Sequence, residues 1–375
     1  MNEEMEAKLI KEIKESVMKA ELETYDEAEA TTKDTKELRK AKEDKSESEE
    51  LKGTTRVEEA AKKTDRMVLL ALCIKYKGDW EEIKKALTDK KELPADEIKA
   101  AEELYDKWCV KGGDKIITII DEEYPKYLIS SPVRPPFVLF CRGNTELLKK
   151  EGETYRTYFG IVGSQDLESG DGKDIERVVK ITQDTIDEFK GNAVIMAFSM
   201  NGTGDTALRT CLLKNYSNVI EIICTGLNNA YPAENGHVQE AISKNGLVIT
   251  TVPWEIEPGS APSVSAVERS DELMTAMTDF LISPVVKRAT GTEQILRLKY
   301  KLFDYGSSSK PRVYITPKDI LDDVSSEEWT EEDKKKGRKK KPAINNSLLA
   351  EGVGAPFLGK RTITHLYEVI HELPF

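Results

Sequence analysis

The sequence is short of the residues that metal binding and nucleophilic catalysis require. Its 375 residues include three histidines and five cysteines, and no two cysteines have Cys-x-x-Cys spacing. Scattered cysteines indicate buried free thiols in a reducing compartment rather than disulfides or metal ligands. These cysteines are Cys73, Cys109, Cys141, Cys211 and Cys224. No serine or cysteine stands in a nucleophile-elbow motif. We therefore expect no metal, no cofactor and no catalytic residue.

The sequence also lacks a long apolar run and an excess of positive charge. No run approaches the roughly 20 residues that a membrane helix needs, and the N-terminus is charged, so we expect a cytoplasmic protein without a membrane partner. Lysine and arginine number 56 against 68 acidic residues, which gives a net charge of −12. Proteins that bind nucleic acid over their whole surface are normally basic. Any DNA binding must therefore rest on a local patch of cations.

Composition divides the chain into parts. Residues 1–64 are highly charged and are expected to form a flexible arm, with a segment that folds on contact with a partner as the alternative. Apolar residues at helical spacing predict a small helical module over residues 65–112. Residues 113–375 form the main domain, interrupted at about 318–342 by a charged insertion that ends in the basic run Lys334–Lys341. That run is expected to be solvated, with a tether to phosphate as its functional alternative.

Strand and helix patterns alternate through the main domain. The expected strands cover residues 159–162, 194–198, 219–224, 247–252, 280–283 and 313–316. The expected helices cover residues 174–189, 206–214, 237–244, 271–278 and 293–305. This rhythm gives right-handed crossovers and a parallel sheet covered on both faces. The fold class predicted is α/β, a Rossmann-like doubly wound and mainly parallel sheet.

The stretch Tyr158–Asp205 contains two strands that each run into a glycine-rich turn and a helix. The first turn holds Gly163 and Ser164, and the second is the segment 202–204. Two such units side by side present two helix N-termini at one edge of the sheet, an arrangement that suits phosphate. We expect the binding site at that edge, although any doubly wound sheet needs such turns. Asp205 is expected to cap the second helix.

A series of short motifs occurs in one order along the chain. They are Asp121, Tyr124-Pro125 and Leu128; Pro135-Pro136; Leu139-Phe140 and Gly143; Val162-Gly163-Ser164; Gly226-Leu227, Tyr231-Pro232 and Glu234-Asn235; Gly246, Thr251 and Pro253; Thr290-Gly291-Thr292; and Asn345-Asn346, Leu348-Leu349 and Glu351-Gly352. In this order, over about residues 68–356, the chain resembles the DNA-processing protein A (DprA/Smf) family, as a divergent member.

The resemblance implies a function without chemistry. Proteins of this family bind single-stranded DNA and help to load a RecA-type recombinase during DNA uptake, natural transformation or recombination. They have no established catalytic centre, and they associate as dimers through the sheet domain. The resemblance therefore implies single-stranded DNA as the ligand, a RecA-type recombinase as a partner, and a homodimer.

The family's DNA-contacting basic residues are altered in this chain. Gln165 stands where the family has arginine, and Ser270, Asp271 and Glu272 fall on its Arg-Asn-Arg motif. Other arginines and lysines can rebuild part of the patch, since single-stranded DNA is held largely by its phosphates. The residues expected to bind DNA or phosphate are Gly163, Ser164, Gln165, Gly202, Thr203, Gly204, Arg209, Arg269, Lys287, Arg288, Gly291 and Thr292.

An alternative from another functional class uses the same fold. The lysine-decarboxylase-like (LOG) nucleotide hydrolases bind phosphate with a Gly-Thr turn followed by a carboxylate, and residues 290–293 resemble that turn. Gln294 and Ile295 lack the glutamate at that family's spacing. A nucleotide N-glycosidase, or a nucleotide sensor without catalysis, is thus the second hypothesis. A mononucleotide should stabilise such a protein, whereas DNA binding should fall steeply with salt.

Overall fold

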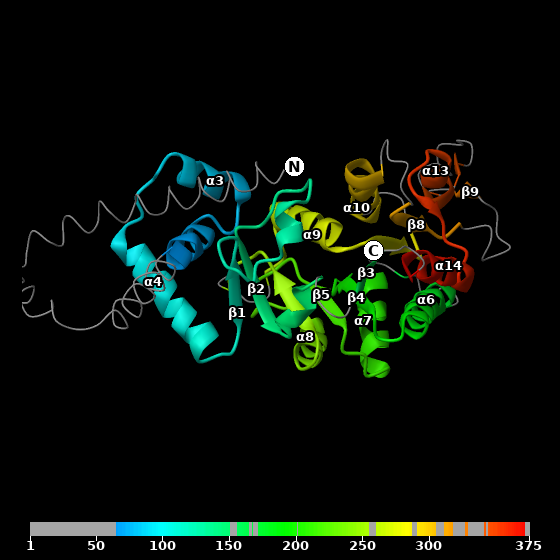
Figure 1. Cartoon of the computed structure of the whole chain (residues 1–375), viewed down its shortest axis with the longest axis horizontal. Helices are drawn as coiled ribbons and strands as arrows, with labels where there is room; N and C mark the ends of the chain where they lie inside the picture. The colour runs from blue at the N-terminus through cyan, green and yellow to red at the C-terminus, as the bar shows by residue number, and fades with distance from the viewer. Residues whose placement is uncertain are drawn as a thin grey trace, which may run out of the picture. The chain divides into compact units, whose positions relative to one another are not determined.

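The protein forms two compact units in the computed structural model (Figure 1). One unit includes the described residues up to 130 together with residues 135–139, and the other contains residues 131–134 and the described residues from 140 onward. The structure describes residues 65–150, 156–164, 167, 172–200, 202–254, 260–286, 291–304, 311–317, 327–328, 341–342 and 344–371. The arm predicted over residues 1–64 lies outside this set, as does most of the insertion predicted at 318–342.

The first unit is mainly helical, as the apolar spacing predicts. Its elements are a helix over residues 65–75, α3 (Trp80–Thr88), α4 (Ala95–Tyr105), the π-helical turn η2 (Asp106–Val110), β1 (Lys115–Thr118) and α5 (Lys126–Ile129). Asp79 begins α3, because its carboxylate accepts the Glu82 N–H at 3.0 Å. Trp80 is partly buried and stacks on Phe137 at a ring separation of 5.6 Å. Trp80 therefore packs within this unit.

The second unit is built on a mainly parallel sheet. Its strands are β2 (Val138–Gly143), which begins in the first unit, β3 (Thr157–Ile161), β4 (Ala193–Phe198), β5 (Val219–Ile222), β6 (Leu247–Thr250), β7 (Phe280–Ser283), β8 (Val313–Ile315) and β11 (Ala355–Pro356). Their order is β2-β6-β5-β4-β3-β7-β8-β11, and β2 alone pairs antiparallel to its neighbour. A Rossmann-like α/β fold results, as predicted.

Helices cover both faces of this sheet. They are α6 (Lys173–Phe189), α7 (Thr203–Leu213), α8 (Gly236–Ser243), α9 (Val264–Met277), α10 (Gly291–Lys299), α13 (Ile344–Ala350) and α14 (Lys360–His371), with the short helical turns η3 (Thr145–Leu148), η4 (Ala233–Asn235) and η5 (Tyr300–Asp304). Helices α8, α7, α6 and α14 follow one another along one face, while α9 and α10 pack together on the other (Figure 1). The central strands are consequently buried on both faces, which explains their continuous apolar sequences.

Two details of the second unit differ from or add to the sequence expectations. Helix α9 begins at Val264, whereas the prediction began it at Asp271. Its N-cap is Ser263, whose hydroxyl accepts the Ala266 N–H at 3.2 Å, a start signal that the sequence interpretation missed. In the predicted insertion, β9 (Glu327–Glu328) pairs antiparallel with β10 (Lys341–Pro342).

The five cysteines are free, and four of them are buried, in agreement with the sequence prediction. Cys224 lies near Met200, with 3.6 Å between the two sulfur atoms. Burial raises the pKa of the Cys224 thiol to about 12. The thiol is therefore protonated at neutral pH and behaves as a packing group. Among the helices that the structure describes, none is long and apolar enough to cross a lipid bilayer.

Candidate functional site

A pocket opens where the strand order reverses direction. From β3 the chain adds β4 on one side, and β7 later returns to pair with β3 on the other side. Ligands of doubly wound proteins bind at such a switch point, at the carboxyl ends of the strands. The cavity volume there is about 70 Å³. It is lined by Ile161, Val162, Gly163, Phe198, Met200, Gly204, Cys224, Val267, Asp271, Gly291, Thr292 and Ile295.

The loop after β3 is packed too closely to accept a side chain at Gly163. A Cβ there would lie 2.4 Å from Thr203 Oγ1 and 2.8 Å from the Val285 carbonyl. Ser164 is locked on both sides, since its N–H donates to the Val285 carbonyl at 3.1 Å and its carbonyl accepts the Thr203 N–H at 3.1 Å. The Thr203 hydroxyl also donates to the Ser164 carbonyl, at 3.3 Å. Ser164 and Thr203, both predicted to contact phosphate, thus hold the loops together and are absent from the pocket lining.

Helix α7 begins at the pocket. Gly202 precedes it with φ of 76° and ψ of −134°, a conformation that favours glycine. A Cβ on Gly204 would lie 2.1 Å from the Phe198 carbonyl, so this glycine lets the helix start directly against the end of β4. The Thr203 N–H is already bonded to Ser164, which leaves the following amides of this helix as the candidates for an anion.

Helix α10 also begins at the pocket, at Gly291 and Thr292. Space around Gly291 is open, because a Cβ built there meets no atom within 4 Å. Lys287 and Arg288 precede this helix in the sequence, but they lie outside the described residues, as does Gln165. The positive ends of α7 and α10 therefore meet at one cavity. The turn pattern predicted instead the N-termini of the helices after β3 and β4, and no residue of α6 is among those that line the cavity.

Asp271 brings a carboxyl group into the pocket from α9. Burial, followed by the nearby carboxylates of Glu268 and Glu272, raises its pKa to about 7. Among the described residues no hydrogen bond or ion pair engages the Asp271 carboxyl. An acid without a cation partner in the cavity lining is the main chemical difference from the phosphate site that the sequence analysis expected.

Glu272, the residue after Asp271, forms an ion pair. Glu272 accepts two hydrogen bonds from the Arg134 guanidinium, at 2.6 Å and 3.2 Å. Both residues belong to the second unit. A carboxylate at this position repels DNA phosphates, and the ion pair with Arg134 reduces that repulsion. Ser270 is buried, and its hydroxyl donates to the Ala266 carbonyl of the same helix at 2.9 Å.

Arg209 lies on α7 and is engaged by its own helix. Its Nε is 2.7 Å from Asp205 Oδ2, and its Nη1 is 3.1 Å from His237 Nε2. The expectation that Asp205 caps α7 is wrong, because the N-cap is Gly202 and no side chain bonds there. Asp205 is the third residue of the helix, and its carboxylate pairs with the arginine one turn later. Neither Arg209 nor Arg269 lines the cavity.

A fully buried acid lies in the sheet beside this helix. Glu221 points from β5 toward Asp205, Ser199 and Gln239, and neither of its oxygens has a hydrogen-bond partner within the described residues. Burial raises the Glu221 pKa to about 8; the polar groups of Ser199 and Gln239 lower it, and the charge of Asp205 raises it. Ser199 and Gln239 are near enough to affect the pKa without reaching hydrogen-bond geometry. Glu221 is therefore largely protonated at neutral pH.

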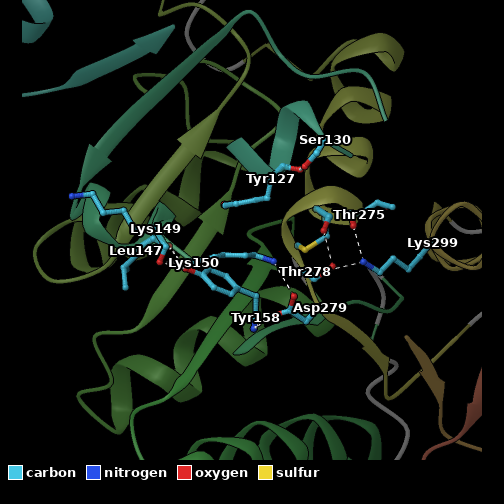
Figure 2. Close-up of polar contacts among 11 residues, drawn as sticks. Tyr127, Ser130, Leu147, Lys149, Lys150, Tyr158, Thr275, Thr278, Asp279 and Lys299 are labelled. Atoms are coloured by element: carbon cyan, nitrogen blue, oxygen red, sulfur yellow. Dashed lines mark hydrogen bonds and ion pairs between the residues drawn. The ribbon is translucent and has the colours of Figure 1, made fainter. Parts of the chain in front are cut away.

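A second polar group lies at the opposite edge of the sheet, where β3 and β7 begin (Figure 2). Asp279 accepts the Tyr158 N–H at 2.8 Å and a hydrogen bond from Lys150 Nζ at 2.9 Å. Lys299, which is fully buried, donates to the carbonyls of Thr275 and Thr278 at 2.8 Å and 2.6 Å. It thereby satisfies the C-terminal end of α9. Burial, followed by the charge of Lys150, lowers the Lys299 pKa to about 7.

The structure brings together four of the predicted site residues, Gly163, Gly204, Gly291 and Thr292, around one cavity. The sequence analysis missed the apolar walls and the role of Asp271 in the lining. The walls come from Ile161, Val162, Phe198, Met200, Val267 and Ile295. A sequence signal existed for the residues that end buried strands, because such positions lie at the ligand edge of a doubly wound sheet. No comparable signal marks α9, whose contact with the pocket depends on how that helix crosses the sheet.

Comparisons with known proteins agree with this architecture. Residues 115–294 match the family model described as DNA recombination-mediator protein A. DNA processing protein DprA of Streptococcus pneumoniae (strain ATCC BAA-255 / R6) is 30% identical over 145 residues, which is 39% of this chain and 45% of that relative. The matched segment thus spans less than half of the relative's length.

Two solved structures share the fold. The structure of DNA processing protein A from Helicobacter pylori, a protein described by its single-stranded DNA binding mode, aligns with a TM-score of 0.50 at 18% identity and covers 68% of this chain and 96% of that one. The X-ray structure of DprA from Streptococcus pneumoniae aligns with a TM-score of 0.52 at 20% identity and covers 82% and 93%. At these identities the likeness shows the fold alone.

Proposed function

Because this chain belongs, through residues 115–294, to the DNA recombination-mediator protein A family, we propose that it binds single-stranded DNA at the carboxyl edge of its parallel sheet. The observation that carries the proposal is the meeting of the α7 and α10 N-termini at the switch-point cavity. Helix N-termini attract phosphate oxygens through their free amides and dipoles. The Helicobacter pylori protein of the same fold is described as a single-stranded DNA binder.

Local cations provide the attraction that the net charge of −12 does not. Lys287 and Arg288 directly precede α10, and Arg269 lies on α9 two residues before the pocket acid. The Arg134–Glu272 ion pair removes one negative charge from the same helix. Backbone phosphates engaged by a few such cations give binding that is independent of sequence and sensitive to salt.

The biological role follows from the family by analogy. We propose that the DNA-bound protein acts as a mediator that delivers a RecA-type recombinase to single-stranded DNA, during DNA uptake or recombination, and that it does so as a homodimer. The cavity of about 70 Å³ is far below the roughly 300–1,000 Å³ of sites for small-molecule ligands, so the structure does not favour a nucleotide sensor or hydrolase. Glu293, the carboxylate that follows the Gly-Thr turn, is paired with Arg297 at 2.9 Å.

The test is fluorescence-polarisation binding of a labelled single-stranded oligonucleotide across a salt series. The variant Lys287→Ala/Arg288→Ala removes two cations next to α10. We expect weaker binding and a plot of log affinity against log salt that is flatter by about 1 to 1.5, since each phosphate contact to single strands contributes about 0.7.

The matched control is Lys190→Ala/Lys244→Ala. These two lysines follow α6 and α8 at their C-terminal ends, which lie at the opposite edge of the sheet because the helices run antiparallel to the strands. The control should bind like the unmodified protein. Deleting Lys334–Lys341 is a second comparison, and loss of binding in that variant alone would move the contact to the insertion. Absence of binding at low salt would refute the proposed function.

A further inference from the structure

Polar side chains from three elements meet inside the second unit with too few hydrogen-bond donors among them. Asp205 is the third residue of α7, Glu221 lies in β5, and Asn235 is the N-cap of α8. These three elements pack against one another (Figure 1). Both carboxyl oxygens of Glu221, Oδ1 of Asp205 and Oδ1 of Asn235 are buried, and none of them has a hydrogen-bond partner within the described residues.

The hydrogen bonds that these side chains do make show which of their atoms are left over. Asp205 Oδ2 accepts a bond from Arg209 Nε at 2.7 Å, so Oδ1 is the oxygen that the arginine does not engage. The Asn235 amide nitrogen donates to the Ser199 carbonyl, which leaves the Asn235 oxygen over. Ser199 and Asp205 are both near enough to Glu221 to change its pKa. The unpaired oxygens therefore lie around the Glu221 carboxyl group.

A buried cluster of unpaired oxygens needs a positive partner. Buried charges are normally paired or coordinate a metal, and buried polar atoms without a partner indicate a bound water or ion. The neighbouring donors are the Ser199 hydroxyl and the Gln239 amide, which are too few for the oxygens present. A water molecule would add donors but would leave the Asp205 and Glu221 carboxylates facing each other. A cation neutralises both.

The donor atoms select the kind of cation. Carboxylate and amide oxygens suit hard ions such as Mg²⁺ and Ca²⁺, whereas zinc and copper sites use mainly cysteine and histidine. Among the described residues, no group of three or more histidine, cysteine, aspartate or glutamate side chains could hold a metal. This cluster is of another kind, because an amide completes two carboxylates. Its members come from separate elements, so no metal-binding spacing marks them along the chain.

We propose that Glu221, Asp205 and Asn235 bind one hard divalent cation, Mg²⁺ or Ca²⁺, where α7 and α8 pack on β5. The ion takes the place of the proton that the Glu221 carboxyl carries when no divalent cation is supplied. It links the first turn of α7 to the sheet and to α8. The site needs no DNA for its formation, so it does not depend on the proposed function.

The experiment is a thermal melt at about pH 8.5, where Glu221 gives up its proton readily because its pKa is raised to about 8. The full chain is treated with a chelator, dialysed, and supplied with MgCl₂, CaCl₂ or, at matched ionic strength, NaCl. We expect a divalent ion at roughly ten times its dissociation constant to raise the thermal midpoint by about 3–5 °C relative to NaCl. Isothermal titration calorimetry should find one ion bound per chain.

Two variants each remove one charged ligand with little change of shape. Glu221→Gln and Asp205→Asn should both lose most of the shift in midpoint and bind the ion at least about tenfold more weakly, because affinity for such ions depends on the number of charged ligands. Far-ultraviolet circular dichroism checks that both variants fold. The matched control is Glu240→Gln, at an exposed position of α8, which should keep the full shift. It separates a bound ion from the general effect of divalent ions on an acidic surface.

The outcomes divide cleanly. A shift caused by either ion in the unmodified protein and in Glu240→Gln, and largely lost in both Glu221→Gln and Asp205→Asn, supports the proposal. Absence of any shift together with absence of calorimetric binding overturns it. A shift that survives in either ligand variant also overturns it, because the ion then binds elsewhere.

Discussion

Replacement of Glu221 by glutamine should remove one pH-dependent contribution to the stability of the protein. The folded protein holds this carboxyl in the middle of β5, fully buried beside Asp205, and its pKa is raised from 4.5 to about 8. Between these two values the folded state binds more protons than the unfolded state. Stability that Glu221 supports at low pH is therefore lost as the pH rises from about 4.5 to about 8.

The size of the effect follows from the shift. At about 1.4 kcal/mol per pKa unit, a rise from 4.5 to about 8 sets an upper limit of about 5 kcal/mol on the loss. Glutamine keeps the shape of the protonated acid and can donate to the Asp205 carboxylate, but it never becomes charged. Glu221→Gln should therefore match the unmodified protein near pH 5 and exceed it at pH 8.5, by roughly 5–10 °C in thermal midpoint if about half of the limit is realised.

The assay is a thermal melt followed by circular dichroism at several pH values from about 5 to 8.5, a range that brackets the shifted pKa. Asp271 contributes a pH dependence of the same sign, but it is present in both proteins and cancels in the difference. Glu240→Gln, on the exposed face of α8, is the matched control and should follow the unmodified protein. Melting curves of Glu221→Gln that run parallel to those of the unmodified protein over the whole range would refute the reasoning.

Three further changes test other parts of the structure. Gly163→Ala should destabilise the second unit by about 1–3 kcal/mol and weaken DNA binding, because the added Cβ would lie 2.4 Å from Thr203 Oγ1. The control Gly291→Ala adds its Cβ in open space and should leave the thermal midpoint nearly unchanged. Lys299→Met should remove a rise in stability between about pH 7 and 10.5. Burial lowers the pKa of the folded lysine to about 7, so in that interval the unfolded chain holds one more proton than the folded protein. Thermal midpoints of the variant and the unmodified protein that change in parallel with pH would contradict this. Arg134→Ala should change stability by less than about 1 kcal/mol, because the arginine is substantially exposed, yet it should weaken oligonucleotide binding at low salt by uncovering an acid.

The charge pattern of the sequence describes the site only in part. Gln165 stands where the related family has arginine, and residues 270–272 replace that family's Arg-Asn-Arg motif. These changes can be identified from the sequence alone. The structure shows that two neighbouring acids on α9 have different surroundings, since Glu272 is paired with Arg134 while Asp271 lines the cavity. Arg134 and Glu272 are far apart in the sequence, so their ion pair could not be predicted from the spacing of residues along the chain.

The sequence by itself determined the α/β class and the position of most strands, and it indicated the edge of the sheet that holds the candidate site. These follow from local physics, because buried strands need continuous apolar runs and tight turns into helices need small residues such as Gly163 and Gly202. Helix α9 was misplaced at its start, since the Ser263 cap preceded a stretch with weak apolar periodicity.

Only the tertiary structure decided which polar groups remain available at that edge. Ser164 and Thr203 bond to each other, and Arg209 is held by Asp205, so three residues predicted to contact phosphate serve the packing of loops and helix. Asp271 enters the cavity from a helix on the other side of the sheet. Local sequence sets the conformation of each segment. Hydrogen-bond partners and burial depend instead on which segments the crossovers bring together. Burial then shifts the pKa of a carboxyl group and so determines its charge.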